Sequence, residues 1–299
     1  MAEPDAVWLE ELFEFLRIPS VSADPAHADD VRRAGEWVCE FVRTAGGECD
    51  VVPGERHPLA VGDIRATNGG VQAPTVILYG HFDVQPPAPL DAWQSPPFEP
   101  EVRDGWIYGR GAADDKGNLY LLLKAAELLA REGELPVNVR VVCDGEEESG
   151  GESVVEFLRE DERGADACLI FDGPMPRIDL PAFEVGTRGL IYFHVRARTG
   201  ERDLHSGLYG GAALNAIHAL TASLAAVTAL PDELRAGIVS PTEEELAAWR
   251  ELDPGSDVLA EQGARPKDAA AADEFYRRTF ADAAVDVNGI HGGEPVLHK

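Results

Sequence analysis

Short apolar runs that alternate with helical patterns constrain the fold of this chain more than any other feature. The runs at residues 75–79, 137–143 and 165–171 have the length and composition of buried strands. Helical patterns follow the first two runs, at residues 118–132 and from about Glu152 onward. Strands that alternate with helices form parallel sheets with helices on their faces. The sequence therefore predicts an α/β fold with a mostly parallel central sheet flanked by helices.

Histidine and acidic side chains cluster just past these predicted strands or at the turns into the helices. The set is His81, Asp83, Asp114, Glu147, Glu148 and Asp172. In an open α/β sheet, ligands bind at the carboxyl ends of the strands. A solvated charge, or the positive end of a helix for Asp115, explains one such acid but not the whole set. Imidazole and carboxylate groups bind metals, so the set predicts a metal site at this edge of the sheet.

The charge balance limits the partners of the chain. The 299 residues include 54 acidic and 26 basic side chains, with a formal net charge of −28. This excess disfavours nucleic acid and anionic membranes as partners. It fits either a salt-adapted cytoplasm or a composition rich in Arg and Ala, and both remain open. With 44% apolar residues, the chain can form one large or two ordinary domains.

Cysteine usage and the N-terminus bear on the cellular compartment. The four cysteines are Cys39, Cys49, Cys143 and Cys168, and they form no C-x-x-C pair. A zinc ribbon and a disulfide framework are therefore not expected. Residues 1–20 have an acidic amphipathic pattern without the basic and apolar segments of a secretory signal. The most apolar long stretch, residues 212–230, contains polar side chains and is interpreted as a packed helix. We expect a cytoplasmic protein.

The alternation of strands and helices stops near Asp179, which indicates a second domain. Residues 184–199 have the pattern of a long strand, and a Gly-rich loop at residues 202–211 follows. The predicted helix at residues 212–230 comes next. We expect one domain at residues 1–184 and a second domain, of α+β class, at residues 185–299.

Three motifs, in order, resemble those of the M20 family of zinc metallopeptidases. Residues 80–86 (GHFDVQP) resemble its GHxDVxP motif, residues 109–117 its GRGxxDxKG motif, and residues 145–150 its GxEExG motif. The finer match is to the dipeptidase branch that includes carnosinases, through GTRG at residues 186–189 and RDLHSG at residues 202–207. The resemblance implies a di-zinc catalytic domain at residues 1–184 and a lid or dimerisation domain at residues 185–299.

The resemblance implies two zinc ions per subunit and four ligands from this chain. His81 and Asp172 would bind one zinc, Glu148 would bind the other, and Asp114 would bridge both. Manganese or cobalt could occupy the same sites, because imidazole and carboxylate ligands suit all three metals.

The resemblance also implies roles for three further side chains. Glu147 would be the general base toward a water molecule held by the two metals. Asp83 would orient His81. His205 would contact the substrate and polarise the scissile carbonyl, often at the site of a partner subunit. A cis peptide is implied between Asp114 and Asp115.

Taken together, the motifs imply a homodimeric enzyme that hydrolyses the amide bond of dipeptides or short peptides. One alternative is an amidohydrolase that removes the acyl group from N-acyl amino acids. Another is a truncated remnant without activity. The family has one more metal-binding histidine after the lid, whereas this chain reaches Lys299 within the lid match, where His291 and His298 also lie. We therefore expect a chain shortened at its C-terminus, with an incomplete lid.

Overall fold

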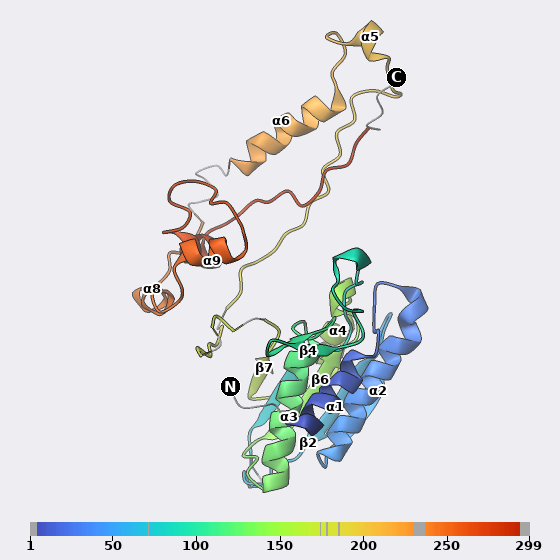
Figure 1. Cartoon of the computed structure of the whole chain (residues 1–299), viewed down its shortest axis with the longest axis vertical. Coiled ribbons are helices and arrows are strands. Elements are labelled where there is room, and N and C mark those ends of the chain that lie inside the picture. The colour runs from blue at the N-terminus through green and yellow to red at the C-terminus, as the bar shows by residue number, and fades with distance from the viewer. Residues whose placement is uncertain are drawn as a thin grey trace. The chain divides into compact units, whose positions relative to one another are not determined.

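The computed structural model of the chain describes residues 5–70, 72–173, 175–177, 179–184, 186–229 and 237–293. The chain divides into two compact units, Met1–Pro174 and Met175–Lys299 (Figure 1). The first unit holds the central sheet and the predicted strand ends.

The central sheet of the first unit has five strands in the order β1-β2-β6-β3-β7. Their bounds are β1 Glu48–Val52, β2 Leu59–Ile64, β3 Thr75–His81, β6 Asn138–Asp144 and β7 Ala167–Ile170. A separate hairpin pairs β4 (Glu101–Arg103) with β5 (Trp106–Tyr108). All three strands predicted as buried runs therefore belong to one sheet.

The α/β class is confirmed, and the sheet is mixed. β3 runs parallel to both β6 and β7, whereas β1 pairs antiparallel with β2, and β2 pairs antiparallel with β6. The prediction of a mostly parallel sheet thus holds for the three strands that are connected through helices. β1 and β2 are antiparallel because only residues 53–58 connect them, and a short connection can join neighbouring strands only as a hairpin.

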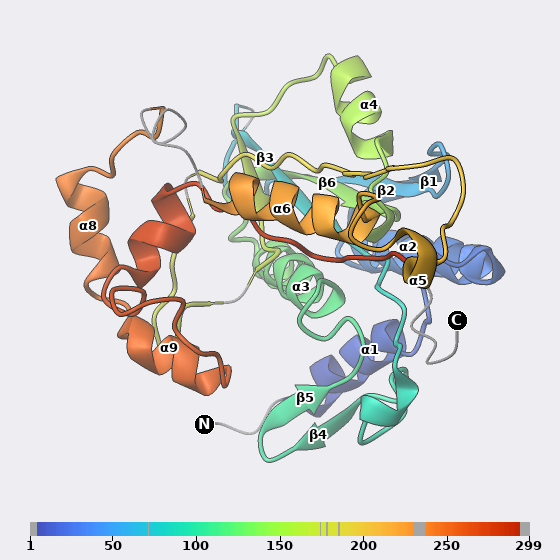
Figure 2. The same ribbon diagram turned by 90° about the horizontal axis from the view of Figure 1, so that it is seen from above.

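Four helices cover the sheet: α1 Ala6–Leu16, α2 Ala28–Thr44, α3 Lys116–Glu132 and α4 Ser153–Glu160. Short 3₁₀ turns lie at η1 Pro25–His27, η2 Leu90–Ala92 and η3 Glu147–Ser149. β6 and β7 flank β3 on opposite sides, so the β3–α3–β6 and β6–α4–β7 connections run in opposite directions. Right-handed crossovers then place α3 and α4 on opposite faces of the sheet, as Figure 2 shows.

Local sequence sets the ends of these helices. The Asp5 carboxylate accepts hydrogen bonds from the backbone N–H groups of Val7 and Trp8, which caps the start of α1. α3 ends at Gly133, whose φ of 76° is the left-handed conformation that glycine adopts at little cost. The helix predicted at residues 118–132 is confirmed within two residues at its start.

The core of the first unit lies between the sheet and helices α1 to α3. Phe15, Val31, Phe82 and Leu119 are all fully buried in one apolar cluster. Phe82 directly follows His81, so the core holds the residue next to the predicted metal ligand. Burial of a phenylalanine side chain contributes roughly 1.5–3 kcal/mol. This packing fixes the end of β3.

The described part of the second unit contains helices and long segments without regular structure. They are α5 Ser206–Tyr209, α6 Ala216–Thr228, α8 Glu243–Trp249, α9 Gly255–Glu261 and a π-helical segment, η4 Arg277–Ala281. α6 confirms the helix predicted at residues 212–230, except for four residues at its start and for Ala229, which is a turn residue. The last residue of the prediction, Leu230, lies outside the described residues.

The strand predicted at residues 184–199 is wrong for the residues that are described there. Residues 186–199 form neither strand nor helix, and Leu190 and Phe193 are 83% and 77% exposed. A strand requires a hydrogen-bonded neighbour, and the described part of this unit shows only the isolated bridge between Arg177 and Leu180. The α+β class of this unit is therefore not seen in its described residues. No helix among the described residues has the length and apolar character needed to cross a membrane.

Candidate metal centre

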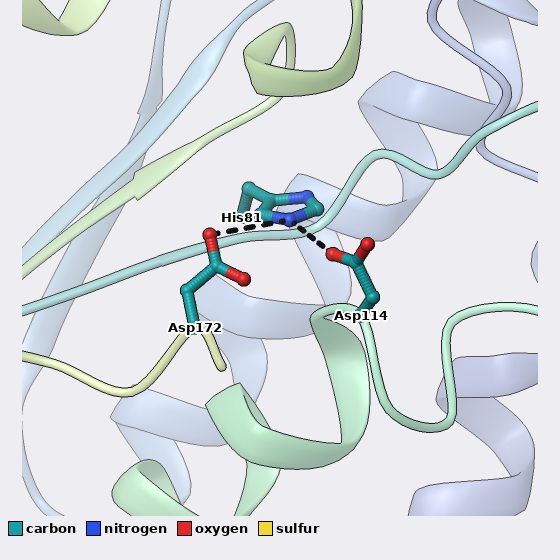
Figure 3. Close-up of side chains that lie close together, drawn as sticks. All are labelled: His81, Asp114 and Asp172. Carbon is teal, nitrogen blue, oxygen red and sulfur yellow. Dashed lines mark hydrogen bonds and ion pairs between the residues drawn. The ribbon is translucent and has the colours of Figure 1, made fainter. Parts of the chain in front are cut away.

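The imidazole of His81 lies at the centre of the predicted site and is fully buried. Its Nε2 atom lies 3.0 Å from Asp114 Oδ1 and 3.8 Å from Asp172 Oδ2 (Figure 3). One ligand atom from each of these three residues lies within 4.8 Å of the others, which is the spacing of a possible metal site. The two carboxylates keep 62% and 28% of their side-chain surface exposed, so the centre is open to solvent on their side.

The three residues come together because of the sheet topology. His81 is the last residue of β3, Asp172 follows the end of β7, and Asp114 lies just before α3. β3 and β7 are parallel neighbours, so their carboxyl ends lie at the same edge. The peptide between Asp114 and Asp115 is cis, as the family resemblance implied.

Asp83 lies on the other side of the His81 ring and is also fully buried. The Nδ1 atom lies 3.0 Å from the Asp83 backbone oxygen and 3.4 Å from its Oδ1 atom. The Oδ2 atom accepts a hydrogen bond of 3.1 Å from the Glu148 backbone N–H, whereas Oδ1 has no hydrogen-bond partner among the described residues. This position is compatible with the predicted orienting role of Asp83.

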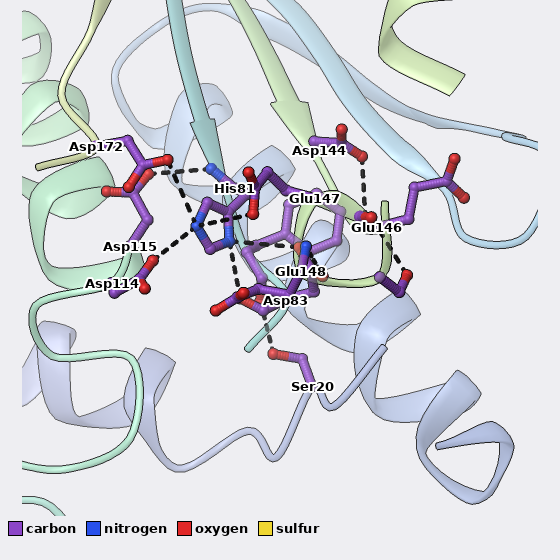
Figure 4. A network of polar contacts seen from close by, with 12 residues as sticks. Ser20, His81, Asp83, Asp114, Asp115, Asp144, Glu146, Glu147, Glu148 and Asp172 are labelled. Carbon is purple, nitrogen blue, oxygen red and sulfur yellow. Dashed lines mark hydrogen bonds and ion pairs between the residues drawn. The ribbon is translucent and has the colours of Figure 1, made fainter. Parts of the chain in front are cut away.

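Glu147 and Glu148 lie in the turn η3, directly after β6. The Oε2 atom of Glu147 lies 3.9 Å from His81 Nε2, and 41% of its side chain is exposed. Glu148 Oε2 instead accepts a hydrogen bond of 2.7 Å from Gln85 Nε2, and Glu148 is not a member of the close three-residue cluster. Figure 4 shows these acids around His81. The interaction with Gln85 is not predictable from spacing in the sequence.

The site carries an excess of negative charge. Burial lowers the pKa of His81, but the close contact and charge of Asp83, with the charges of Asp115 and Asp172, raise it to about 10. Burial raises the pKa of Glu147 and Glu148, and neighbouring carboxylates raise both further. The surrounding carboxylates therefore favour the protonated, positively charged form of His81. A bound divalent cation would offset the same negative charge.

Asp115 contributes to the site in a way that the sequence did not reveal. Its position before a helix suggested only a favourable charge at the positive end of that helix. Its buried carboxylate makes no capping hydrogen bond and accepts one of 3.1 Å from the His81 backbone N–H. Burial raises its pKa to about 7. A Cβ atom added to Gly80 would lie 2.7 Å from Asp115 Oδ2. Glycine at position 80 thus permits the close approach of this carboxylate to β3.

His205, the predicted substrate-contacting residue, belongs to the second unit. It caps α5, where its Nδ1 atom accepts a hydrogen bond of 3.0 Å from the Gly207 backbone N–H. The neutral ring therefore carries its proton on Nε2, which can donate to an acceptor. His291 forms no part of a helix or strand, and His298 lies outside the described residues.

The fold and this cluster define an α/β protein with a candidate metal centre at the carboxyl edge of its sheet. Residues 77–299 match peptidase family M20/M25/M40, and the chain belongs to this family. The cysteinylglycine-S-conjugate dipeptidase of Corynebacterium striatum is 36% identical over 219 residues, which are 71% of this chain and 47% of that protein. The Beta-Ala-His dipeptidase of Rattus norvegicus is 35% identical over 219 residues, which are 68% and 44% of the two chains.

A solved structure shows the same fold. It is that of the di-peptidase Dug1p from Saccharomyces cerevisiae, with a TM-score of 0.68 and 21% identity over 97% of this chain and 66% of that chain. The predicted membership of the M20 family and likeness to its dipeptidases are confirmed. The chain spans less than half the length of the two relatives named above.

Proposed function

We propose that this chain carries out metal-dependent hydrolysis of the amide bond of dipeptides or short peptides. One observation carries the proposal. Asp114 and Asp172 come from separate elements, and each places a carboxylate oxygen near Nε2 of the buried His81 ring. The matching relatives named as dipeptidases support the substrate class.

The residues of the centre fit a divalent cation. One imidazole nitrogen and several carboxylate oxygens form a ligand set that zinc accepts. Among the ion pairs of the described residues, His81 is the only cationic partner of Asp83, Asp114, Glu147 and Asp172. The buried Asp83 Oδ1 atom also lacks a hydrogen-bond partner. A cation at this edge offsets these charges.

We assign the metal ligands as the family pattern implies. His81 and Asp172 would hold one zinc, Glu148 would hold a second, and Asp114 would serve both. When bound, two such ions lower the pKa of a water molecule and polarise a substrate carbonyl, which manganese or cobalt also can do. Asp83 keeps the His81 ring in place through its contacts with Nδ1.

Glu147 is the proton carrier in this proposal. Its carboxylate is partly exposed beside the centre, and its raised pKa brings it closer to neutral pH, where a general base works best. It takes a proton from the attacking water and delivers it to the leaving amine. His205 donates from Nε2 to the substrate carbonyl, in a homodimer formed through the second unit.

The test is metal content and hydrolysis measured on one sample of the 299-residue chain. Zinc bound in excess of one ion per chain, with turnover of a dipeptide panel, supports the proposal. Turnover of N-acyl amino acids alone would favour a deacylase, and metal-free, inactive protein would reject hydrolysis by this chain. Glu147→Ala separates binding from chemistry, since it should keep the metal and lose turnover.

A further inference from the structure

Glu146 differs from the two glutamates that follow it. Its side chain is fully buried and points away from His81, whereas Glu147 and Glu148 face the centre (Figure 4). Nothing in the family pattern requires an acid here, since this residue fills the variable second position of GxEExG. A buried carboxylate is costly unless it is hydrogen-bonded, so its partners are informative.

The Glu146 carboxylate binds three backbone N–H groups from two segments, one distant in the chain and one nearby. Oε2 accepts hydrogen bonds of 3.2 Å from Arg56 and 3.0 Å from His57, both in the β1–β2 connection. Oε1 accepts one of 3.0 Å from Ser153, the first residue of α4. A negative charge at a helix start is also favoured by the helix dipole. The carboxylate therefore links the β1–β2 connection to the start of α4, the helix that follows the turn η3.

Gly151 packs closely against the Glu146 carboxylate. A Cβ atom added to Gly151 would lie 2.0 Å from Glu146 Oε1. The Glu146 backbone oxygen also accepts hydrogen bonds from Ser149 and Gly151, and its N–H donates to Asp144 Oδ1. Both ends of the turn that carries Glu147 and Glu148 are thus held by one residue.

The same network reaches the loop that carries His81 and Asp83. His57, whose N–H donates to Glu146, places its ring Nε2 atom 2.9 Å from the Ser22 backbone oxygen. Ser20 Oγ donates a hydrogen bond of 2.6 Å to the Phe82 backbone oxygen. Residues 20–22 therefore contact both the β1–β2 connection and the residue between His81 and Asp83.

We propose that Glu146 is a positioning residue, whose buried carboxylate fixes the turn η3 and so sets the places of Glu147 and Glu148 beside His81. This role deepens the proposed function and rests on it for the identity of the ligands. Like charges at Glu147, Glu148 and Asp83 repel one another, and a firmly held backbone keeps them together before a cation binds.

The test compares Glu146→Ala and Glu146→Gln with Glu127→Gln. Glu127 is a matched control because it is also a buried, paired carboxylate of the first unit, on α3, and has no part in the site. Hydrogen exchange of the metal-free full chain and zinc affinity by chelator competition are measured for each. Glu146→Ala should speed exchange at the Glu148 and Gly151 amides at least about 10-fold and weaken zinc binding about 10–100-fold.

Glu146→Gln keeps one acceptor oxygen, so its amide exchange and its zinc affinity should both lie between those of Glu146→Ala and the wild-type chain. If the proposal is right, Glu127→Gln should produce neither effect, although its unfolding temperature should fall. Wild-type exchange and zinc affinity in Glu146→Ala would overturn the positioning role. Failure of the wild-type chain to bind zinc would overturn the proposed function instead, while the exchange experiment would still decide the role of Glu146 in the turn.

A second observation, independent of the first, concerns Cys39 and Cys49. Both thiols are buried, and their Sγ atoms lie 2.8 Å apart across the contact between α2 and β1. A disulfide bond is only about 0.8 Å shorter than this separation. The hydrogen bond from Cys49 lowers the pKa of the Cys39 thiol, which favours the nucleophilic thiolate. β1 is the edge strand of the sheet, where local opening admits a small reagent.

We infer that Cys39 and Cys49 are a dithiol pair that a small-molecule disulfide converts to an intramolecular disulfide. The Cys39 thiolate attacks the reagent, forms a mixed disulfide and releases one thiol. The Cys49 sulfur then displaces the second thiol and closes the Cys39–Cys49 bond. The two protons lost by the protein end on the two released thiols, so the protein is oxidised and the reagent is reduced.

The test treats the full chain with oxidised glutathione and maps the thiols by alkylation and mass spectrometry. The expected product has lost two hydrogen atoms, links Cys39 to Cys49, and leaves Cys143 and Cys168 open to alkylation after unfolding. Cys39→Ser and Cys49→Ser should each prevent the link, whereas Cys143→Ser should not. Four alkylated thiols, a stable glutathione adduct, or a link to Cys143 would overturn the inference.

Discussion

The two units of this chain differ in how far they bury their apolar side chains. In Met1–Pro174, Phe15 and Val31 are completely buried between helices and sheet. In the described residues of Met175–Lys299, Leu190, Ile191 and Phe193 are each more than three-quarters exposed. The segments of both units have strand-like or helical patterns. The difference teaches that an apolar pattern becomes a strand only where neighbouring strands and helices are present to cover it.

The candidate site residues are also divided between the two units. Two residues of the cluster, His81 and Asp172, come from the ends of parallel strands, and Asp114 comes from the turn before α3. His205 instead lies beside a four-residue helix of the other unit. The candidate metal ligands His81, Asp114 and Asp172 therefore all belong to the first unit. The next four experiments test this contrast, each with a partner substitution in the second unit or with a metal control.

Phe15→Ala should have the largest effect on folding. Phe15 is fully buried and stacks on Trp37, with ring centroids 4.2 Å apart. Removal of a buried phenylalanine side chain costs about 3–5 kcal/mol, because a cavity is left behind. Phe193→Ala should change the free energy of unfolding by less than about 0.5 kcal/mol. Urea unfolding followed by circular dichroism measures both, and equal losses would mean that Phe193 is buried in solution.

His81→Ala should weaken zinc binding by at least about 100-fold, since it removes the central ligand together with its buried ring. The matched substitution His218→Ala, at an exposed position of α6, should leave zinc affinity unchanged. Chelator competition on the two purified variants measures the difference. Wild-type affinity in His81→Ala would place the metal elsewhere.

The stability of the metal-free chain should fall as the pH rises from 6 to 9. The pKa of His81 is about 10 in the folded chain against 6.5 for the free group, so its stabilising charge is complete below pH 6.5 and lost toward pH 10. The raised pKa values of Asp115, about 7, and Asp144, about 6, act in the same direction at lower pH.

The free energy of unfolding should fall by at least about 1 kcal/mol between pH 6 and 9, which lowers the Tm by roughly 2–4 °C. Thermal unfolding with and without zinc measures it. Zinc should flatten the dependence, because the cation replaces the proton on His81. A metal-free Tm that rises across this pH range would contradict the charge balance derived for the site.

Ser20→Ala should have the smallest effect. It removes the 2.6 Å hydrogen bond to the buried Phe82 backbone oxygen, which costs about 1 kcal/mol. Ser256→Ala, at an exposed position of α9 whose hydroxyl contacts Asp257, should cost less than about 0.5 kcal/mol. Equal values from urea unfolding would show that the Ser20 contact contributes nothing to the first unit.

Much of the fold and part of the site could be predicted from local patterns. Short apolar runs bounded by Gly and acidic residues marked β3, β6 and β7, and the strand ends identified His81 and Asp172. The antiparallel pairing of β2 with β6 could not be derived, because it depends on contacts between residues far apart in the chain. The strand expected at residues 184–199 was wrong because its pattern carries no information on a partner.

The sequence alone determined the family, the α/β class and the set of acids around His81, since these depend on residue type and spacing. Only the tertiary structure showed that Asp115 lies beneath Gly80, that Gln85 contacts Glu148, and that Glu146 binds backbone N–H groups. The physical reason is that adjacent residues of the same type can face opposite environments. Glu146 and Glu147 are neighbours in the chain, but the course of the turn η3 buries one carboxylate and presents the other to the centre.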